Sequence, residues 1–396
     1  MPPSEARSGA IQAGSGMRVL TLSYEFPPIG GGGSGVVKGL AASLVEMGHT
    51  VDVVTMGFGG LPREETVQGI NVHRVDCGRR SENRCTAMET LRYVSRAQPI
   101  VRTLLASQDY DLVHAHFILP DGVLALRECV PGGVPYIITA HGSDVPGYNI
   151  KPFFKVAHPL LQWLWRRVTA GAAEIISPSE TLKSLIEAVG PGTPVTVVPN
   201  GIAADRYLPR DKKPQILVAT RFVERKGVQY LLEALAGGGI PWKAIIVGGG
   251  EYEKELLELN DRLGRPATFL GWLDNESAEF RDLLEESAIY ALPSDYENFP
   301  VCLLEAMAAG CAIVTTKGHG CEEVVGDCAE LVTPGRLDAK ACIDELRAAL
   351  LRLTTDPARC AALGARARQR LDDNFTWAAI ARRYVEHYRL HSDREY

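Results

Sequence analysis

The chain has 396 residues, of which 46% are hydrophobic and 23% are charged. That length suits two α/β domains of roughly 180 residues each, and the composition excludes a disordered chain. A formal net charge of -6 at pH 7 argues against a general nucleic-acid binder.

Cysteine usage and hydropathy point to a cytoplasmic protein. The nine cysteines include no C-x-x-C pair, which is typical of reduced thiols. The sequence has no run of 18 apolar residues, so no membrane span is predicted. Residues 1–16 are rich in Ser, Gly and Ala, so we expect a disordered tail rather than a signal peptide, with Met17 as a candidate start.

Short β-branched runs alternate with helix-length segments along the whole chain, a pattern typical of parallel sheets covered on both faces. The predicted strands are Met17–Ser23, Val51–Met56, Ile70–Val75, Asp111–His116, Tyr136–Ala140, Glu174–Ser177, Val195–Pro199, Gln215–Ala219, Lys243–Val247, Thr268–Leu270, Ile289–Leu292, Ala312–Thr315 and Leu331–Thr333.

A Pro-rich, charged stretch at 199–214 interrupts this alternation and predicts a hinge. We therefore expect two doubly wound Rossmann-like domains, at 17–203 and 204–374, that face a central cleft. The amphipathic segment at about 375–396 is predicted to be a helix that crosses back to the first domain.

Two candidate site motifs follow strands of the first domain. A loop from Glu25 to Gly35 holds five glycines, which let backbone amides approach a ligand closely. Its spacing does not fit a dinucleotide fingerprint, and a flexible surface loop is the alternative. His141 follows the strand at Tyr136–Ala140 and is expected to point into the cleft, although a lone histidine is usually structural.

Two further motifs lie in the second domain. Arg221 and Lys226 share a short loop, and paired cations suit a diphosphate, although a solvated basic turn is common. Glu297 and Glu305 flank Pro300, which fits the first helical position N1. Helical geometry then places Glu305 about one turn inside a helix whose first amides are available to a phosphate. The alternative is that Glu297 and Glu305 are glutamates without a role in a binding site.

In this order and spacing the motifs resemble family 4 of the retaining glycosyltransferases with the GT-B fold. The resemblance runs from Met17 over nearly the whole chain. It includes HAHF and PDG within 114–122, HGSD at 141–144, VVPNG at 197–201, RFVERKG at 221–227, GGGE at 248–251, FLGWL at 269–273 and E-x7-E at 297–305.

The resemblance implies a metal-independent enzyme that moves a hexose from a nucleotide diphosphate sugar to a hydroxyl acceptor with retention of configuration. It assigns the diphosphate to Arg221 and Lys226, the sugar hydroxyls to Glu297, the ribose to Glu305, and a place beside the sugar to His141. We thus predict catalytic roles for His141, Arg221, Lys226 and Glu297, and donor contacts at Gly31, Gly32, Gly33, Arg221, Lys226, Glu297, Asn298, Phe299, Pro300, Val301, Cys302 and Glu305.

The chain departs from the family pattern at two places. The usual E-G-F-G is E-N-F-P here, and the usual Gly-Gly before E-V-V is replaced in the segment that starts at Lys317. The second change puts in doubt which amides meet the phosphate, and Lys317 or His319 could tune the choice of donor.

A UDP-sugar is the first choice of donor and GDP-mannose the second. The acceptor is expected to be a glycan or glycoconjugate precursor, with a lipid-linked acceptor as one option. Its recognition would fall to loops such as 57–69 and 76–98. A GT-B nucleotide-sugar epimerase and a non-catalytic binding subunit remain alternatives, and a dehydrogenase is a distant one.

One segment outside these motifs carries a membrane hypothesis. Residues 151–167 mix four cations with aromatic and aliphatic side chains, so they could lie on the anionic inner face of a membrane with Trp163 and Trp165 at the interface. An ordinary packed helix explains the same pattern equally well. Asp109-Tyr-Asp111 matches a D-x-D metal motif, but it precedes a strand, so a turn is favoured there.

Overall fold

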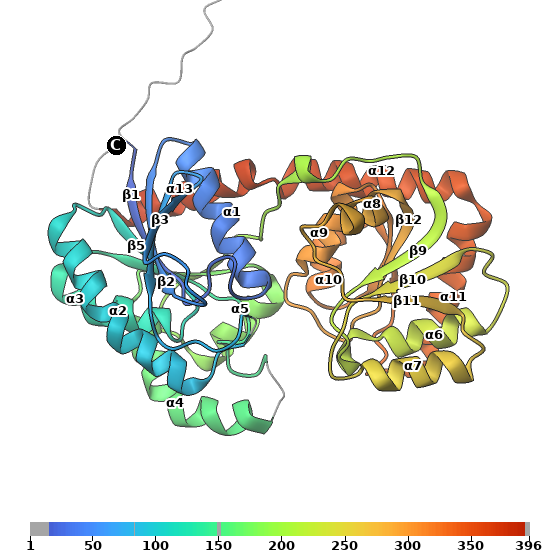
Figure 1. Ribbon diagram of the computed structural model, residues 1–396, viewed down its shortest axis with the longest axis horizontal. Coiled ribbons are helices and arrows are strands. Elements are labelled where there is room, and N and C mark those ends of the chain that lie inside the picture. Colours follow the sequence, from blue (N-terminus) through green and yellow to red (C-terminus); the bar gives the residue numbers. More distant parts are fainter. Residues whose placement is uncertain (1–15, 83, 149–151, 393–396) are drawn as a thin grey trace, which may run out of the picture. The chain divides into compact units, whose positions relative to one another are not determined.

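The computed structural model describes residues 16–82, 84–148 and 152–392, with the backbone alone at 152–160 (Figure 1). The chain divides into a smaller unit of residues 1–138, 171–173 and 384–396, and a larger unit of residues 139–170 and 174–383. The predicted boundary at residues 203 and 204 stays a prediction. The tail predicted at 1–16 lies outside the described residues, except for Gly16.

The first sheet has eight strands in the order β3-β4-β2-β1-β5-β6-β7-β8. β4, β2, β1 and β5 pair in parallel, as do β7 and β8. Each of the seven runs predicted for this half overlaps one of the strands. Their bounds are β1 Arg18–Leu22, β2 Thr50–Met56, β3 Glu64–Val67, β4 Ile70–Val75, β5 Leu112–His116, β6 Tyr136–Thr139, β7 Glu174–Ser177 and β8 Val195–Val197.

Two elements replace predicted loops. β3 lies within 57–69 and pairs antiparallel with β4 through a turn at Gln68 and Gly69, both with positive φ. Its residues alternate between exposed and half-buried, so no apolar run marked it. The segment 76–98 was also expected to be a loop, but α2 begins at Ala87 with a capping box from Thr86 and Glu89.

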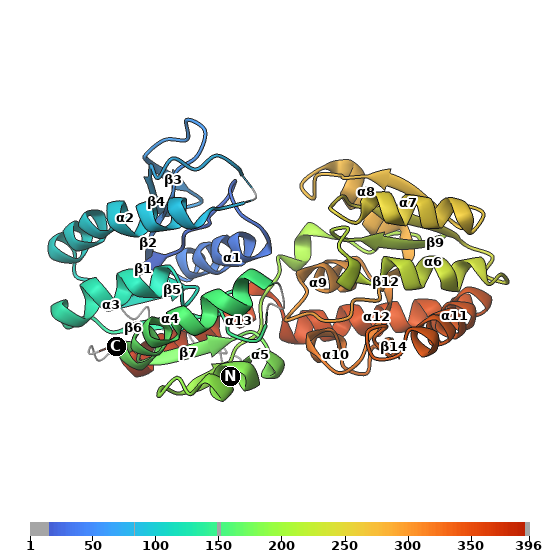
Figure 2. The same cartoon turned by 90° about the horizontal axis from the view of Figure 1, so that it is seen from below.

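Helices flank the first sheet, and α2 lies beside α3 in the smaller unit (Figure 2). Buried aliphatic side chains on α1 and α3 supply part of its core, including Leu40 and Leu124. The helices that follow its strands are α1 Gly32–Glu46, α2 Ala87–Ser107, α3 Asp121–Gly132, α4 Pro152–Gly171 and α5 Glu180–Val189.

The second sheet has six strands in the order β11-β10-β9-β12-β13-β14, all of them parallel. The chain order reverses between β9 and β12, and this is the point where doubly wound sheets bind ligands at their carboxyl ends. All six strands match predicted runs. Their bounds are β9 Lys213–Ala219, β10 Lys243–Val247, β11 Ala267–Gly271, β12 Ser287–Leu292, β13 Ala312–Thr316 and β14 Ala329–Val332.

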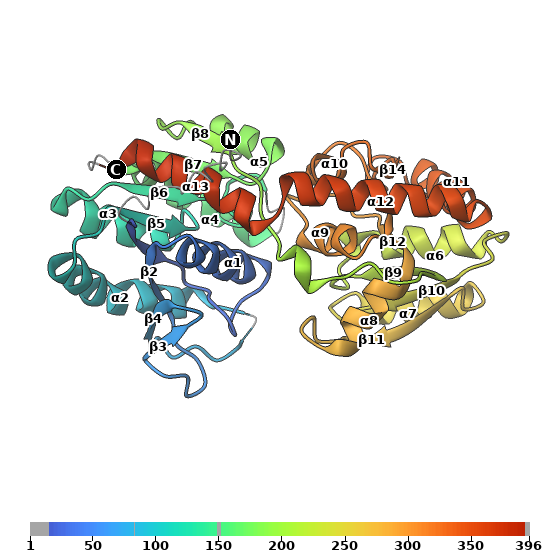
Figure 3. The same cartoon turned by 90° about the horizontal axis from the view of Figure 1, so that it is seen from above.

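Two apolar cores cover the two faces of this sheet. One joins α8, α9, α10 and α12, and the other joins α6, α7 and α11. In Figure 3, α12 runs beside α9, and the two helices are in contact. The elements are η1 Ala204–Arg206, η2 Glu224–Lys226, α6 Val228–Ala236, α7 Glu253–Arg262, α8 Ala278–Glu286, α9 Val301–Ala308, α10 Gly320–Val325, α11 Ala339–Thr355 and α12 Pro357–Asn374.

The last helix, α13 (Trp377–His391), begins in the larger unit, and its final turns from Tyr384 belong to the smaller unit. There the buried Tyr388 hydroxyl lies 2.8 Å from Nδ1 of His114. The predicted return of the C-terminal helix to the first domain is confirmed. His114 is therefore part of the packing around α13.

Candidate active site

The candidate site lies at the switch point of the second sheet. Arg221 and Lys226 follow β9, and Glu297 follows β12, which is the hydrogen-bonded neighbour of β9. Because the strands are parallel, their carboxyl ends meet at one edge, and loops far apart in the sequence converge there. The structure thus brings together the two second-domain motifs that the sequence singled out.

Backbone contacts bind these two loops to each other. The Asp295 N–H donates to the Arg225 carbonyl at 2.7 Å. Gly227 has φ +73°, and a Cβ there would lie 1.9 Å from the carbonyl oxygen of Pro293. The glycine after Lys226 is therefore required by the close approach of the two loops as well as by its backbone conformation.

Lys226 and Glu297 form a buried ion pair at this junction. The Ser294 hydroxyl donates to the same carboxylate oxygen, Glu297 Oε1, at 2.7 Å. Burial opposes ionisation of Glu297, but the Lys226 ammonium and the Arg225 guanidinium outweigh it and hold the pKa of Glu297 below its usual value. The site therefore presents a fixed anion and a fixed cation side by side.

Glu305 lies on α9, half-buried, and accepts a hydrogen bond from the Tyr207 hydroxyl at 3.1 Å. Burial raises the pKa of Glu305 to about 7, and the Tyr207 hydrogen bond only partly offsets this. The helix starts at Val301, so Pro300 is its N-cap rather than the first helical residue N1 as predicted. Glu305 still lies about one turn inside the helix.

The residues between Glu297 and Glu305 differ from one another in which of their groups could reach a donor. Phe299 is buried, and its ring centroid lies 5.7 Å from that of Phe375, so its side chain belongs to the core. Only the backbone of Phe299 is left for the predicted donor contact. The N–H groups of Val301 and Cys302 belong to the first turn of α9, where helices lack internal acceptors.

His141 follows β6 within the larger unit and lies next to Asn298. The Asn298 amide donates to the His141 carbonyl at 3.3 Å and accepts from the Ser179 hydroxyl at 2.6 Å. The Asp144 carboxylate accepts from the His141 backbone N–H at 3.1 Å. Burial lowers the pKa of the His141 imidazole to about 4, so the ring is neutral at pH 7.

Arg221 is exposed, and among the described residues no hydrogen bond or ion pair of its side chain occurs.

The sequence missed Tyr207 and Ser179, which contact site residues, and gave His319 only a role in donor choice. His319 is buried beside Glu297, whereas Lys317 is exposed. Tyr207 and Ser179 carry no motif, so only the fold could reveal them.

The glycine loop after β1 belongs to the smaller unit. Gly31 caps α1, and its N–H donates weakly to Glu25 Oε2 at 3.4 Å. A Cβ at Gly31 or Gly32 would meet no atom within 4 Å, so nothing in the described chain requires a glycine there. Gly33 is partly exposed beside them.

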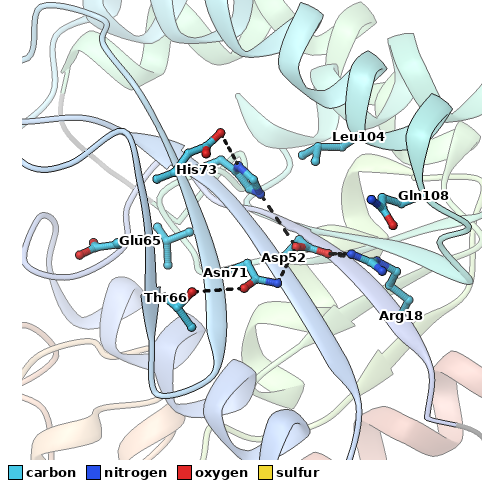
Figure 4. Close-up of a pocket in the computed structure, with 10 residues that line it drawn as sticks. Arg18, Asp52, Glu65, Thr66, Asn71, His73, Leu104 and Gln108 are labelled. Carbon is cyan, nitrogen blue, oxygen red and sulfur yellow. Dashed lines mark hydrogen bonds and ion pairs between the residues drawn. The ribbon is translucent and has the colours of Figure 1, made fainter.

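A polar pocket of about 370 Å³ opens elsewhere in the smaller unit (Figure 4). At its centre Asp52 accepts from the Asn71 amide at 3.0 Å and from the Tyr110 hydroxyl at 2.9 Å, and it pairs with Arg18 at 3.2 Å. Arg18 is the first residue of β1, so the pocket lies at the opposite edge from the glycine loop. None of the residues that the motifs singled out lines this pocket, so the pocket is not the candidate site.

No group of three or more metal-ligating side chains occurs among the described residues. All nine cysteines are free thiols. Within the described part of the chain, no helix combines the length and hydropathy needed to cross a bilayer.

The segment predicted to contact a membrane, 151–167, falls largely on α4, and the side chains of 151–160 lie outside the described residues. Trp163 is 61% exposed. Trp165 is buried, and its Nε1 donates to the Asp144 carbonyl at 3.1 Å, so its predicted place at a membrane interface is wrong.

Comparison with known proteins agrees with this geometry. Residues 30–206 match the model for Glycosyltransferase Family 4, and residues 184–370 match that for Glycosyl transferases group 1. The chain belongs to the GT4-type glycosyltransferases with the GT-B fold, as the sequence resemblance predicted.

One sequence relative and two solved structures are similar to this chain over most of its length. The MMP alpha-(1->4)-mannosyltransferase of Mycolicibacterium hassiacum is 29% identical over 94% of this chain and 98% of its own length. Sucrose-phosphate synthase from Thermosynechococcus elongatus has a TM-score of 0.78 at 22% identity, covering 94% of this chain and 98% of its own. Anabaena HepE, solved in complex with UDP and glucose, has a TM-score of 0.72 at 20% identity, covering 94% of this chain and all of its own.

Proposed function

We propose that the chain is a metal-independent, retaining hexosyltransferase that uses a nucleotide diphosphate sugar as donor and a hydroxyl group as acceptor. The observation that supports this most strongly is the buried pair of Lys226 and Glu297 at the switch point of the second sheet. A cation next to a carboxylate matches a donor in which a charged phosphate is bonded directly to a polyhydroxylated ring.

The diphosphate would lie against the cationic part of the site. Lys226 and the exposed Arg221 would compensate its charge, and the first N–H groups of α9, those of Val301 and Cys302, would donate to its oxygens. This charge compensation stabilises the leaving nucleotide diphosphate as the bond to the sugar breaks. It is the task that a divalent metal performs in other transferases, which is why we propose metal independence.

The carboxylates would hold the two sugars of the donor. Glu297 is ionised and would accept from hydroxyls of the hexose, and Glu305 would accept from the ribose. Neutral His141 would donate a hydrogen bond to the hexose. The family resemblance assigns the glycines at 31–33 to the donor phosphate or the acceptor, and a Cβ at Gly31 or Gly32 would meet no atom within 4 Å.

In the proposed reaction, the bond between the anomeric carbon and the β-phosphate oxygen breaks while the acceptor oxygen bonds to the same face of that carbon. The acceptor proton passes to an oxygen of the leaving phosphate. A side-chain base is then unnecessary. This fits the two candidate bases, because Glu297 is ion-paired with Lys226 and the pKa of His141 is only about 4.

We propose a UDP-sugar as the first choice of donor, which the UDP in the HepE complex supports, and GDP-mannose as the second. The acceptor would be a glycan or glycoconjugate precursor, including a lipid-linked one. Exposed Trp163 supports contact of α4 with the inner face of a membrane, and a cytoplasmic location is proposed with it.

A donor panel in EDTA tests this proposal. UDP-, GDP- and ADP-sugars should be compared by thermal shift with wild type, Glu297→Gln and Glu285→Gln. Glu285 is the matched control, because it is a buried carboxylate paired with Arg210 at 2.7 Å and is not one of the proposed donor contacts. One donor should stabilise wild type and the control but only weakly stabilise Glu297→Gln. No stabilisation of wild type by any nucleotide sugar would refute the proposed transferase.

A further inference from the structure

His319 is a buried imidazole in the segment that starts at Lys317. It precedes α10 and is 3% exposed. Its Nδ1 accepts a hydrogen bond from the backbone N–H of Glu297 at 3.3 Å, and its Nε2 lies 3.2 Å from the Thr316 hydroxyl. The imidazole thus connects the end of β13 to the residue that is proposed to contact the hexose.

The neighbouring hydrogen bonds determine which ring nitrogen carries the proton. The Thr316 hydroxyl donates its only hydrogen to the Ser294 carbonyl at 2.6 Å, so it can only accept from His319. The Glu297 backbone N–H can only donate. His319 is therefore the neutral tautomer with the proton on Nε2 and a free electron pair on Nδ1.

The backbone beside His319 supports the same loop. The Gly320 N–H donates to the Glu297 carbonyl at 3.2 Å. A Cβ at Gly320 would lie 1.6 Å from the Asn298 carbonyl oxygen, so α10 approaches this loop as closely as a glycine allows. Both backbone polar groups of Glu297 are therefore held by consecutive residues.

Charged and aromatic groups surround the ring on several sides. Burial lowers the pKa of His319, and Arg336 lowers it further, whereas the carboxylates of Glu297, Glu322 and Glu323 raise it. The ring of Tyr296 lies 5.6 Å from the imidazole. The net effect favours the neutral form that the hydrogen bonds require.

We propose that His319 is a positioning residue for Glu297, and that the neutral Nε2–H tautomer holds the Glu297 backbone where its carboxylate meets the transferred sugar. This role rests on the proposed function of Glu297. Protonation of Nδ1 would place its N–H against the Glu297 N–H and release the loop. At saturating donor, the transfer rate should therefore fall at acidic pH, as His319 becomes protonated.

Three variants test the role. His319→Asn places an amide oxygen near the position of Nδ1 and does not titrate, His319→Gly removes the side chain, and His49→Asn is the control. His49 is also buried, and its Nδ1 accepts from the Met17 backbone N–H at 3.0 Å in the smaller unit. The readouts are kcat between pH 5 and 8 and the ratio of Kd for UDP to Kd for the UDP-sugar.

We expect His319→Gly to lower kcat and this ratio about tenfold with the Kd for UDP unchanged, because UDP lacks the hexose. His319→Asn should keep most of the rate at pH 8 and lose the acid decline, and His49→Asn should behave like wild type. An acid decline that persists in His319→Asn, or an unchanged ratio in His319→Gly, would overturn the role. If wild type binds neither UDP- nor GDP-sugars, the proposed function itself fails.

Discussion

Removal of the Lys226 ammonium should change both the stability of the larger unit and its dependence on pH. In wild type the pKa of Glu297 lies below its usual value, because Lys226 and Arg225 outweigh the effect of burial. In Lys226→Met, Glu297 stays buried but loses its closest cation, so burial dominates and its pKa rises above the value in the unfolded chain. Loss of one partner from a buried pair costs about 3–5 kcal/mol.

The sign of the pH dependence follows from the direction of each shift. Wild-type Glu297, with its lowered pKa, contributes stability above the unfolded pKa, and this is lost as the pH falls through the folded value. In Lys226→Met the native state holds its proton more tightly than the unfolded state. Stability of the variant should therefore decrease as the pH rises from about 4.5, and the gap to wild type should widen toward pH 7.

Denaturant unfolding of the full chain, followed between pH 4.5 and 7.5, measures this gap. The Tm at pH 7 should fall by roughly 6–12 °C for a loss of about 3 kcal/mol in a unit of this size. Lys226→Met with Glu297→Gln should recover most of the loss, because no buried charge is left unpaired. A gap that does not vary with pH, or a double variant no more stable than Lys226→Met, would refute this reasoning.

Three further predictions concern binding and packing. Because burial raises the pKa of Glu305 to about 7, the KM for donor should rise several-fold between pH 8 and pH 6 in wild type and stay constant in Glu305→Gln, as steady-state kinetics can determine. Arg221→Ala should weaken donor binding about tenfold by titration calorimetry while the Tm changes by less than about 2 °C, because this side chain is exposed; a large drop in Tm would contradict the assignment. Gly320→Ala should lower the Tm and slow transfer, since its Cβ would lie 1.6 Å from the Asn298 carbonyl oxygen; an unchanged Tm would show that α10 can move away.

The sequence predicted thirteen of the strands because buried parallel strands are continuous apolar runs between helices. It missed β3, whose only signal was the turn at Gln68 and Gly69, since an exposed edge strand such as Glu64–Val67 has no apolar run. The start of α2 is marked only by the capping box from Thr86 and Glu89, and the exposed Met88 and Leu91 obscure the buried face of this helix in the sequence.

The candidate site was predictable as far as motif spacing allowed. Lys226 and Glu297 follow neighbouring strands, so fold topology brought them together as expected. The contact of Tyr207 with Glu305 spans 98 residues, and no local pattern marks it. Trp165 was misplaced because an amphipathic composition does not tell whether a helix faces lipid or its own protein.

The most direct test of a retaining, metal-independent transfer is the anomer released when the bound donor is slowly hydrolysed in EDTA. Proton NMR within the first minutes should show free hexose with the configuration that it had in the donor, and Glu297→Ala should release it far more slowly. Release of the opposite anomer would contradict retention. A donor that stays intact in EDTA but reacts when a divalent metal is added would contradict metal independence.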